Sequence, residues 1–122
     1  MYSERLLDHF RNPRNVRDLA PPAVTVEASN PACGDILRLA ARFEDGRVAE
    51  AAYKTRGCTA TIASGSALTE WMKGKSAAEL ERFRPAELEE SLALSPESKH
   101  AAVLCGDALA LLVRKAGQAP LP

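Results

Sequence analysis

The sequence predicts an α+β fold in which a three-stranded antiparallel sheet is packed on one face by helices. Residues 36–43 alternate apolar and polar side chains, and residues 48–55 form a second half-buried run after the turn sequence at 44–47. After Cys58 the apolar period lengthens to that of a helix. An order of one helix, three strands and then helices is typical of the α+β class.

The N-terminal elements lead into the sheet. Residues 2–11 predict a short helix that Ser3 caps, with an apolar stripe formed by Leu6, Leu7 and Phe10. The turn sequence at 12–15, Asn-Pro-Arg-Asn, ends this helix. The stiff pair Pro21-Pro22 then leads into a first strand at Val24-Thr25-Val26.

The second and third strands form a hairpin with one face free for helices. Strand 36–43 directs its apolar side chains to one face and two arginines to the other, namely Leu37, Leu39, Ala41 and Phe43 against Arg38 and Arg42. The loop 44–47 turns the chain, and strand 48–55 is again half buried. The three strands therefore form a meander.

Helices fill the second half of the chain. The helix after Cys58 ends at Gly74 and is rich in small residues, although Gly65 in its middle should cost about 1 kcal/mol relative to alanine. Short helices follow at 77–82 and 85–92.

The last helix begins at Ser95-Pro96. Its predicted core stripe consists of Leu104, Ala108, Leu111 and Leu112. The tail 117–122 is expected to fray.

Composition indicates a single domain over residues 1–122 and excludes several functions. Sixteen basic residues balance sixteen acidic ones and aromatic residues are few, which argues against a nucleic-acid partner. The start of the chain lacks the apolar core of a signal peptide, and no apolar run could span a membrane. Three cysteines without an export signal indicate reduced thiols or metal ligands, and hence a cytoplasmic protein.

Three short segments contain a set of side chains suited to binding a metal. Cys33 and Asp35 flank a glycine, Cys58 precedes a helix whose N-terminal amides should lower the pKa of its thiol, and His100 lies early in the last helix. Thiolates with an imidazole and one carboxylate suit zinc or an iron–sulfur cluster better than magnesium or calcium.

Each of these residues also has a simpler interpretation. Asp35 could only cap a turn, and His100 could be a surface histidine. Cys105 shares a helix face with Ala101, Ala108 and Leu112, which favours packing over metal binding. His9 in the first helix is interpreted as structural or solvated.

Nearly the whole chain resembles the IscU family, the NifU-N-terminal-like (U-type) scaffolds of iron–sulfur cluster assembly. No single motif is specific, but the matches run in order along about a hundred residues. The segments that carry the resemblance are Tyr2-Ser3, 8–10, 12–16, 31–35, 54–58, 63–64, 69–71, 73–76 and His100.

The resemblance implies an IscU/SufE-like α/β sandwich and a scaffold function without enzymatic turnover. Such proteins accept persulfide sulfur from a cysteine desulfurase, build a [2Fe–2S] cluster with iron, and pass the cluster to apo-proteins. It implies the ligands Cys33, Asp35, Cys58 and His100, with Asp35 tuning the lability of the cluster. Resting forms often carry zinc.

Two departures from the family pattern modify this expectation. The family's third ligand cysteine, directly after the histidine, is Ala101 here, so Cys33 or Cys58 would accept the sulfur. Cys105 lies one helical turn further, roughly 6 Å along the axis, and could join only if the helix start shifts or unwinds. The segment 94–99 keeps only part of a Leu-Pro-Pro-Val-Lys motif, which leaves recognition by an Hsp70/J-type chaperone open.

Two other functions remain alternatives at this point. One is a zinc-dependent sulfurtransferase that accepts persulfide without building a cluster, as in the SufU-like branch. That branch has an insertion before its last ligand and usually a basic residue in place of the histidine. This chain has His100 and no such insertion, which favours the scaffold branch. The other alternative is a purely structural zinc module.

Overall fold

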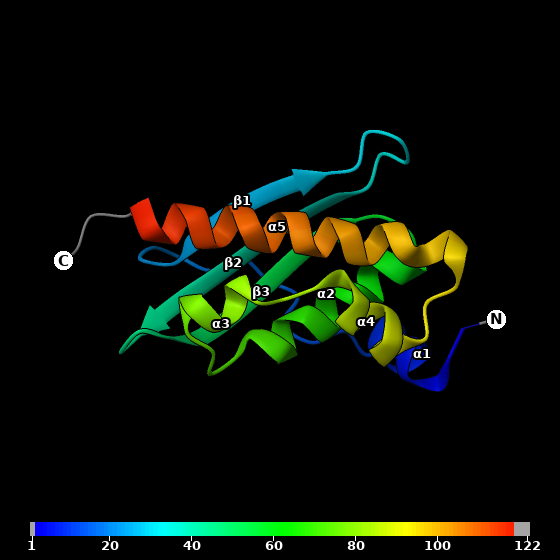
Figure 1. The fold of residues 1–122 in the computed structure, drawn as a ribbon, viewed down its shortest axis with the longest axis horizontal. Helices are drawn as coiled ribbons and strands as arrows, with labels where there is room; N and C mark the ends of the chain where they lie inside the picture. The colour runs from blue at the N-terminus through cyan, green and yellow to red at the C-terminus, as the bar shows by residue number, and fades with distance from the viewer. Residues whose placement is uncertain (1, 119–122) are drawn as a thin grey trace.

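The computed structural model describes residues 2–118 and has the predicted order of elements (Figure 1). In chain order the elements are α1 (Glu4–Arg11), β1 (Val24–Ser29), β2 (Ile36–Glu44), β3 (Arg47–Arg56), α2 (Thr59–Met72), α3 (Ala77–Glu81), α4 (Pro85–Leu92), the 3₁₀ turn η1 (Pro96–Ser98) and α5 (Lys99–Gln118). Strand β1 is longer than predicted. Helix α5 includes residues 117 and 118, and the rest of the predicted frayed tail lies outside the described residues.

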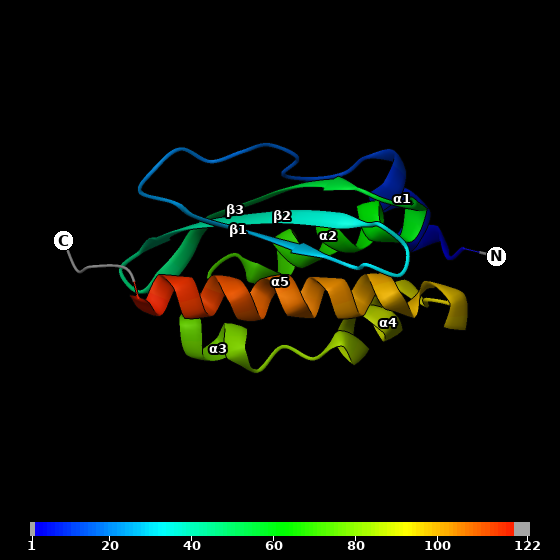
Figure 2. The same cartoon turned by 90° about the horizontal axis from the view of Figure 1, so that it is seen from above.

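The sheet is the predicted antiparallel meander. Its strand order is β1-β2-β3, and Leu39 pairs with Val26 on one side and Tyr53 on the other. Helices α2 and α5 pack on one face of this sheet, and α3 and α4 pack against α5 (Figure 2). The fold class predicted from the sequence is therefore confirmed.

The chain between α1 and β1 covers the outer edge of β3. The Tyr53 amide donates to the Asn15 carbonyl at 2.9 Å, and the Arg17 amide donates to the Tyr53 carbonyl at 3.2 Å. On the polar side of the sheet, Arg38 and Lys54 both form ion pairs with Asp18. This edge is thus closed by the chain itself, which limits strand pairing with other molecules.

The alternation predicted for β2 is confirmed, because Leu37, Leu39 and Ala41 are all fully buried and Phe43 packs against the core. Two residues predicted to line apolar stripes are instead exposed: Phe10 on α1 by 36% and Leu111 on α5 by 37%. The buried faces of these helices are rotated slightly from the predicted ones, toward the side that buries His9 on α1 and Leu109 on α5.

His9 is a structural residue. Its side chain is 3% exposed, and its Nδ1 lies 2.7 Å from the Ser66 hydroxyl of α2. The same hydroxyl accepts the Arg14 backbone N–H at 2.9 Å, so its own proton is free to donate to the Nδ1 of a neutral imidazole. Burial is the main cause that lowers the pKa of His9, which favours this neutral form. The contact joins α1 to the middle of α2.

Helix propensity predicts that alanine would be more stable than glycine at position 65 of α2, but the packing around Gly65 opposes this prediction. A Cβ atom at this position would lie 2.5 Å from two carbons of the Tyr53 ring, closer than real Cβ contacts allow. The Tyr53 hydroxyl donates to the Ile62 carbonyl at 2.7 Å, which fixes the ring against α2. The absence of a side chain at Gly65 therefore permits close packing that outweighs its propensity cost.

We predict that Gly65→Ala lowers the free energy of unfolding by about 2 kcal/mol, since overpacking and loss of the Tyr53 hydrogen bond exceed the gain in helix propensity. Urea denaturation measures this change. Gly117→Ala is the matched control, because nothing lies within 4 Å of its Cβ position. A Gly65→Ala variant as stable as the parent would contradict the packing argument.

Candidate metal centre

The turn between β1 and β2 presents Cys33 and Asp35. Asn30 closes this turn: its carbonyl accepts the Gly34 N–H at 2.8 Å, and its side-chain oxygen accepts the Ala32 N–H at 2.9 Å. Gly34 has a φ of +78°, a conformation that glycine adopts without steric cost. The turn leaves Cys33 exposed and buries Asp35, which is only 7% exposed.

Cys58 is the N-cap residue of α2. Its carbonyl accepts the Ile62 amide at 3.1 Å, but its side chain makes no capping hydrogen bond to the helix. The thiol is exposed and lies 3.8 Å from Asp35 Oδ2 and 3.4 Å from the Thr61 hydroxyl. It therefore points toward the β1–β2 turn.

His100 lies in the first turn of α5. Its Nδ1 is 2.9 Å from the Glu97 carbonyl, and because a carbonyl can only accept, Nδ1 carries a proton. In the protonated ring Nε2 can donate to the Cys58 thiolate, and in the neutral ring Nε2 keeps a lone pair for a metal, the arrangement found in metal-binding histidines. Nε2 lies 3.5 Å from Cys58 Sγ and 3.6 Å from Asp35 Oδ2.

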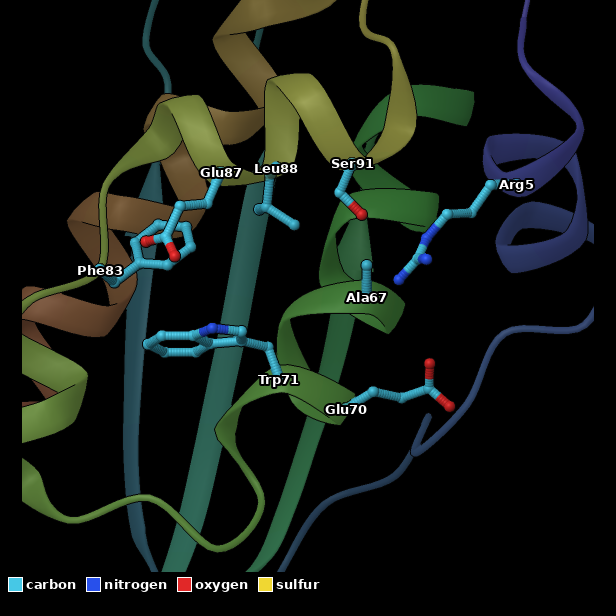
Figure 3. Close-up of a pocket in the computed structure, with 8 residues that line it drawn as sticks. All are labelled: Arg5, Ala67, Glu70, Trp71, Phe83, Glu87, Leu88 and Ser91. Atoms are coloured by element: carbon cyan, nitrogen blue, oxygen red, sulfur yellow. The ribbon is translucent and has the colours of Figure 1, made fainter.

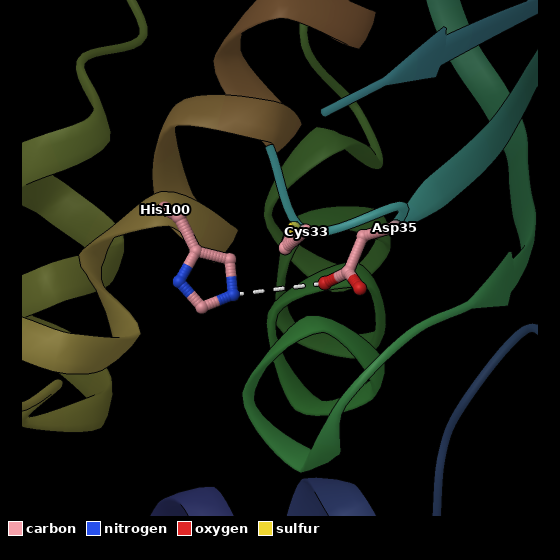
Figure 4. Close-up of side chains that lie close together, drawn as sticks. All are labelled: Cys33, Asp35 and His100. Carbon is pink, nitrogen blue, oxygen red and sulfur yellow. Dashed lines mark ion pairs between the residues drawn. The ribbon is translucent and has the colours of Figure 1, made fainter. Parts of the chain in front are cut away.

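The four residues predicted as ligands are thus brought together from three separate segments. One ligand atom each from Cys33, Asp35 and His100 lies within 4.8 Å of the other two, and Figure 4 shows the three side chains converging. The distances among Cys58, Asp35 and His100 are 3.5, 3.6 and 3.8 Å. Two ligands of a tetrahedral zinc ion lie roughly 3.3–3.8 Å apart, so this donor set fits such an ion.

The hydrogen bonds around Cys58 favour its ionised thiolate form. Burial opposes ionisation of its thiol, but hydrogen bonds, among them those from the Thr61 and Ala60 backbone amides and from a protonated His100, outweigh burial and lower the pKa of Cys58 below its ordinary value. The hydrogen bond with Cys58 is the main cause that raises the pKa of His100. The prediction of a lowered Cys58 pKa from its place at a helix start agrees with this geometry.

Cys105 lies in the hydrophobic core. Its side chain is fully buried, and burial raises the pKa of its thiol to about 12. Ala101, which stands one turn earlier, is also fully buried. This placement agrees with the packing interpretation of Cys105, and the described structure does not bring its thiol into the group formed by Cys33, Asp35 and His100.

Thr61 is a residue of the site that the sequence interpretation missed. It is fully buried, and its hydroxyl donates to Asp35 Oδ2 at 2.5 Å. Its position three residues after Cys58, on the same side of the first helical turn, is the signal that could have identified it.

A separate pocket of about 250 Å³ lies between α1, α2 and α4 (Figure 3). Trp71 and Phe83 form its apolar wall, and Arg5, Glu70 and Glu87 lie at its rim. It contains no thiol or imidazole, so it lacks the soft ligands of the candidate metal centre. Within residues 2–118, no helix is both long and apolar enough to cross a membrane.

The fold and this cluster define a class of small α+β proteins whose loops present thiol, carboxylate and imidazole groups at one end of a sheet. The family model described as the NifU-like N terminal domain matches residues 1–117. The chain belongs to this family.

The relatives agree with this assignment. The chain is 43% identical over 117 residues to the "Iron-sulfur cluster assembly scaffold protein IscU" of Azotobacter vinelandii, covering 93% of this chain and 91% of the relative. It is 39% identical to the "Iron-sulfur cluster assembly enzyme IscU" of Drosophila melanogaster, covering 89% and 73%. The fold is similar to the N-terminal part of a NifU-like protein from Brucella abortus, with a TM-score of 0.75, 23% identity and coverage of 97% and 95%.

We predict that His100→Ala slows alkylation of Cys58 by iodoacetamide at pH 7 by about threefold. Loss of the His100 hydrogen bond destabilises the thiolate, so the pKa of Cys58 rises and less thiolate is present at a given pH. Peptide mapping by mass spectrometry across a pH series separates the three cysteines. Cys105 should stay unmodified in the folded protein, and an unchanged Cys58 profile would contradict the proposed His100 contact.

Proposed function

We propose that this protein is a scaffold on which a [2Fe–2S] cluster is assembled and from which it is transferred to apo-proteins. The observation that carries the proposal is the tetrahedral spacing of Cys58, Asp35 and His100, with Cys33 beside them. The names of the relatives, which associate them with iron–sulfur cluster assembly, support the same function.

The proposed ligands are Cys33, Asp35, Cys58 and His100. Thiolates bind iron and also accept sulfane sulfur by attack on a persulfide. Cys33 and Cys58 are both exposed and are therefore the proposed persulfide acceptors, in agreement with the absence of a cysteine at position 101. Zinc is the ion we propose for the resting site, since the donor set fits it.

The burial of the site supports transfer rather than permanent storage of a cluster. The two thiols reach the surface, His100 is partly exposed, and only Asp35 is buried. A cluster bound here would keep one side open to an acceptor's thiols, which is needed for exchange of ligands. We propose that Asp35, the one hard oxygen ligand among softer ones, makes the bound cluster easier to release.

The proposed partners follow from this chemistry. A cysteine desulfurase would supply persulfide, and apo-proteins or carriers would receive the cluster. Recognition by an Hsp70/J-type chaperone stays outside the proposal, because Leu94 of the altered motif is buried and Pro96 lies in the turn η1. We place the protein in the cytoplasm, where its three free thiols would stay reduced.

A zinc-dependent sulfurtransferase is the second candidate function. The observation that favours it is Ala101, which removes one thiol from the site and leaves an exposed Cys58 with a lowered pKa to accept sulfur. In either function the protein receives and passes on a group. We propose a scaffold rather than an enzyme: the name of the Azotobacter relative calls that protein a scaffold, although the name of the Drosophila relative calls that protein an assembly enzyme.

Anaerobic reconstitution separates the two functions. The protein is incubated with ferrous iron, cysteine, a cysteine desulfurase and dithiothreitol, which supplies the electrons that sulfane sulfur needs beyond those from iron. A scaffold should develop the visible absorption of a [2Fe–2S] cluster. Persulfide with retained zinc and no cluster would instead identify the sulfurtransferase. If neither a cluster nor a persulfide forms, both functions are contradicted.

We predict that Cys33→Ala and Cys58→Ala each reduce the cluster yield at least about tenfold, because each removes a proposed thiolate ligand. Cys105→Ala is the matched control and should leave the yield unchanged, since its thiol is buried in the core. Visible absorption and iron and sulfide content measure the yield. Loss of the cluster in Cys105→Ala alone would contradict the proposed ligand set.

A further inference from the structure

The Thr61 hydroxyl bridges two of the proposed ligands. Thr61 Oγ1 lies 2.5 Å from Asp35 Oδ2 and 3.4 Å from Cys58 Sγ. A hydroxyl has one proton, and the carboxylate can only accept, so the short contact assigns that proton to Asp35.

Asp35 Oδ2 is also the oxygen that faces the site. It lies 3.6 Å from His100 Nε2 and 3.8 Å from Cys58 Sγ. A carboxylate oxygen has two lone pairs and can accept from Thr61 while it presents the other lone pair to a metal. The hydrogen bond therefore constrains the very atom that we propose as a ligand.

The backbone on the other side leaves Asp35 little room. A Cβ added at Gly57 would lie 3.0 Å from Asp35 Cγ, from Asp35 Oδ2 and from Thr61 Cβ. The carboxylate is thus packed between the Gly57 backbone and the Thr61 side chain. Both Asp35 and Thr61 are buried, so the carboxylate of Asp35 cannot move far while Thr61 donates its hydrogen bond.

We propose that Thr61 is a positioning residue of the metal centre, which orients Asp35 Oδ2 toward Cys58 and His100 before metal arrives. This inference rests on the proposed function, because it assigns Asp35 as a ligand. Hydrogen bonds to ligating carboxylates fix their orientation, and their removal commonly weakens metal binding 10–100-fold. Thr61 thereby sets how firmly the site retains its metal or cluster.

The test measures the affinity of the full chain for cobalt(II) by competition with a chelator, with the cobalt absorption spectrum as a second readout. Thr61→Val keeps the shape of the side chain but removes the hydroxyl, and it should weaken binding about tenfold. Thr61→Ser keeps the hydroxyl and should restore binding to within about twofold of the parent. The spectrum of Thr61→Val should also change, because Asp35 no longer has a fixed orientation.

Two controls separate positioning from a general loss of structure. Ser64→Ala removes another buried hydroxyl of α2, one that has no partner among the described residues, and it should leave the cobalt affinity unchanged. In an Asp35→Ala background, Thr61→Val should have no further effect, because Thr61 acts through Asp35. Melting of the metal-free variants reports any change in stability, and Thr61→Ala replaces Thr61→Val if the latter does not fold.

Equal cobalt affinities for Thr61→Val and the parent would overturn the inference and leave the metal site intact. The same fall in affinity with and without Asp35 would overturn it too, since Thr61 would then act by another route. A parent protein that binds no cobalt would contradict the metal site itself, and with it this inference.

Discussion

The close packing of α2 against β3 is the constraint on which the site depends. Gly65 lets the helix lie directly on the Tyr53 ring, and the Tyr53 hydroxyl bonds to the Ile62 carbonyl in the first turns of the helix. This contact fixes the N-terminus of α2 beside the start of β2. The pairing of Ile36 with Arg56 at the end of the β2–β3 hairpin brings Asp35 to the same place, so Asp35 and Cys58 meet although they lie 23 residues apart in sequence.

The same helix is joined to the N-terminal region through Ser66, whose hydroxyl contacts His9 and accepts the Arg14 amide. Helix α2 is thus tied to the sheet and to α1, while the thiols at its start remain exposed. The site combines a rigid half, made of the buried Asp35 and its neighbours, with an open half that faces solvent. A scaffold needs both, because it must organise a cluster and then release it.

Sequence alone predicted the fold class, the order of the elements and the group of residues that converges. Apolar periodicity indicates the type of an element and its approximate buried face, but not how far a helix is rotated about its axis. For this reason the sequence places Phe10 and Leu111 on buried faces, whereas both are exposed in the structure. The role of Gly65 could not be predicted, since it comes from the Tyr53 ring of a separate element. The spacing of Thr61 from Cys58 indicates that it lies near the site, but its hydrogen bond to Asp35 could not be predicted from the sequence. Cys105 illustrates the opposite case, because its helical neighbours alone indicated packing.

Zinc K-edge X-ray absorption of the zinc-loaded protein tests the central claim most directly, since it counts the sulfur and the nitrogen or oxygen ligands of the ion. The distances among Cys58, Asp35 and His100, with Cys33 beside them, predict two sulfurs at about 2.3 Å and two lighter atoms at about 2.0–2.2 Å. Three sulfur ligands would mean that α5 unwinds to bring Cys105 to the metal. A shell without sulfur would contradict the proposed site altogether.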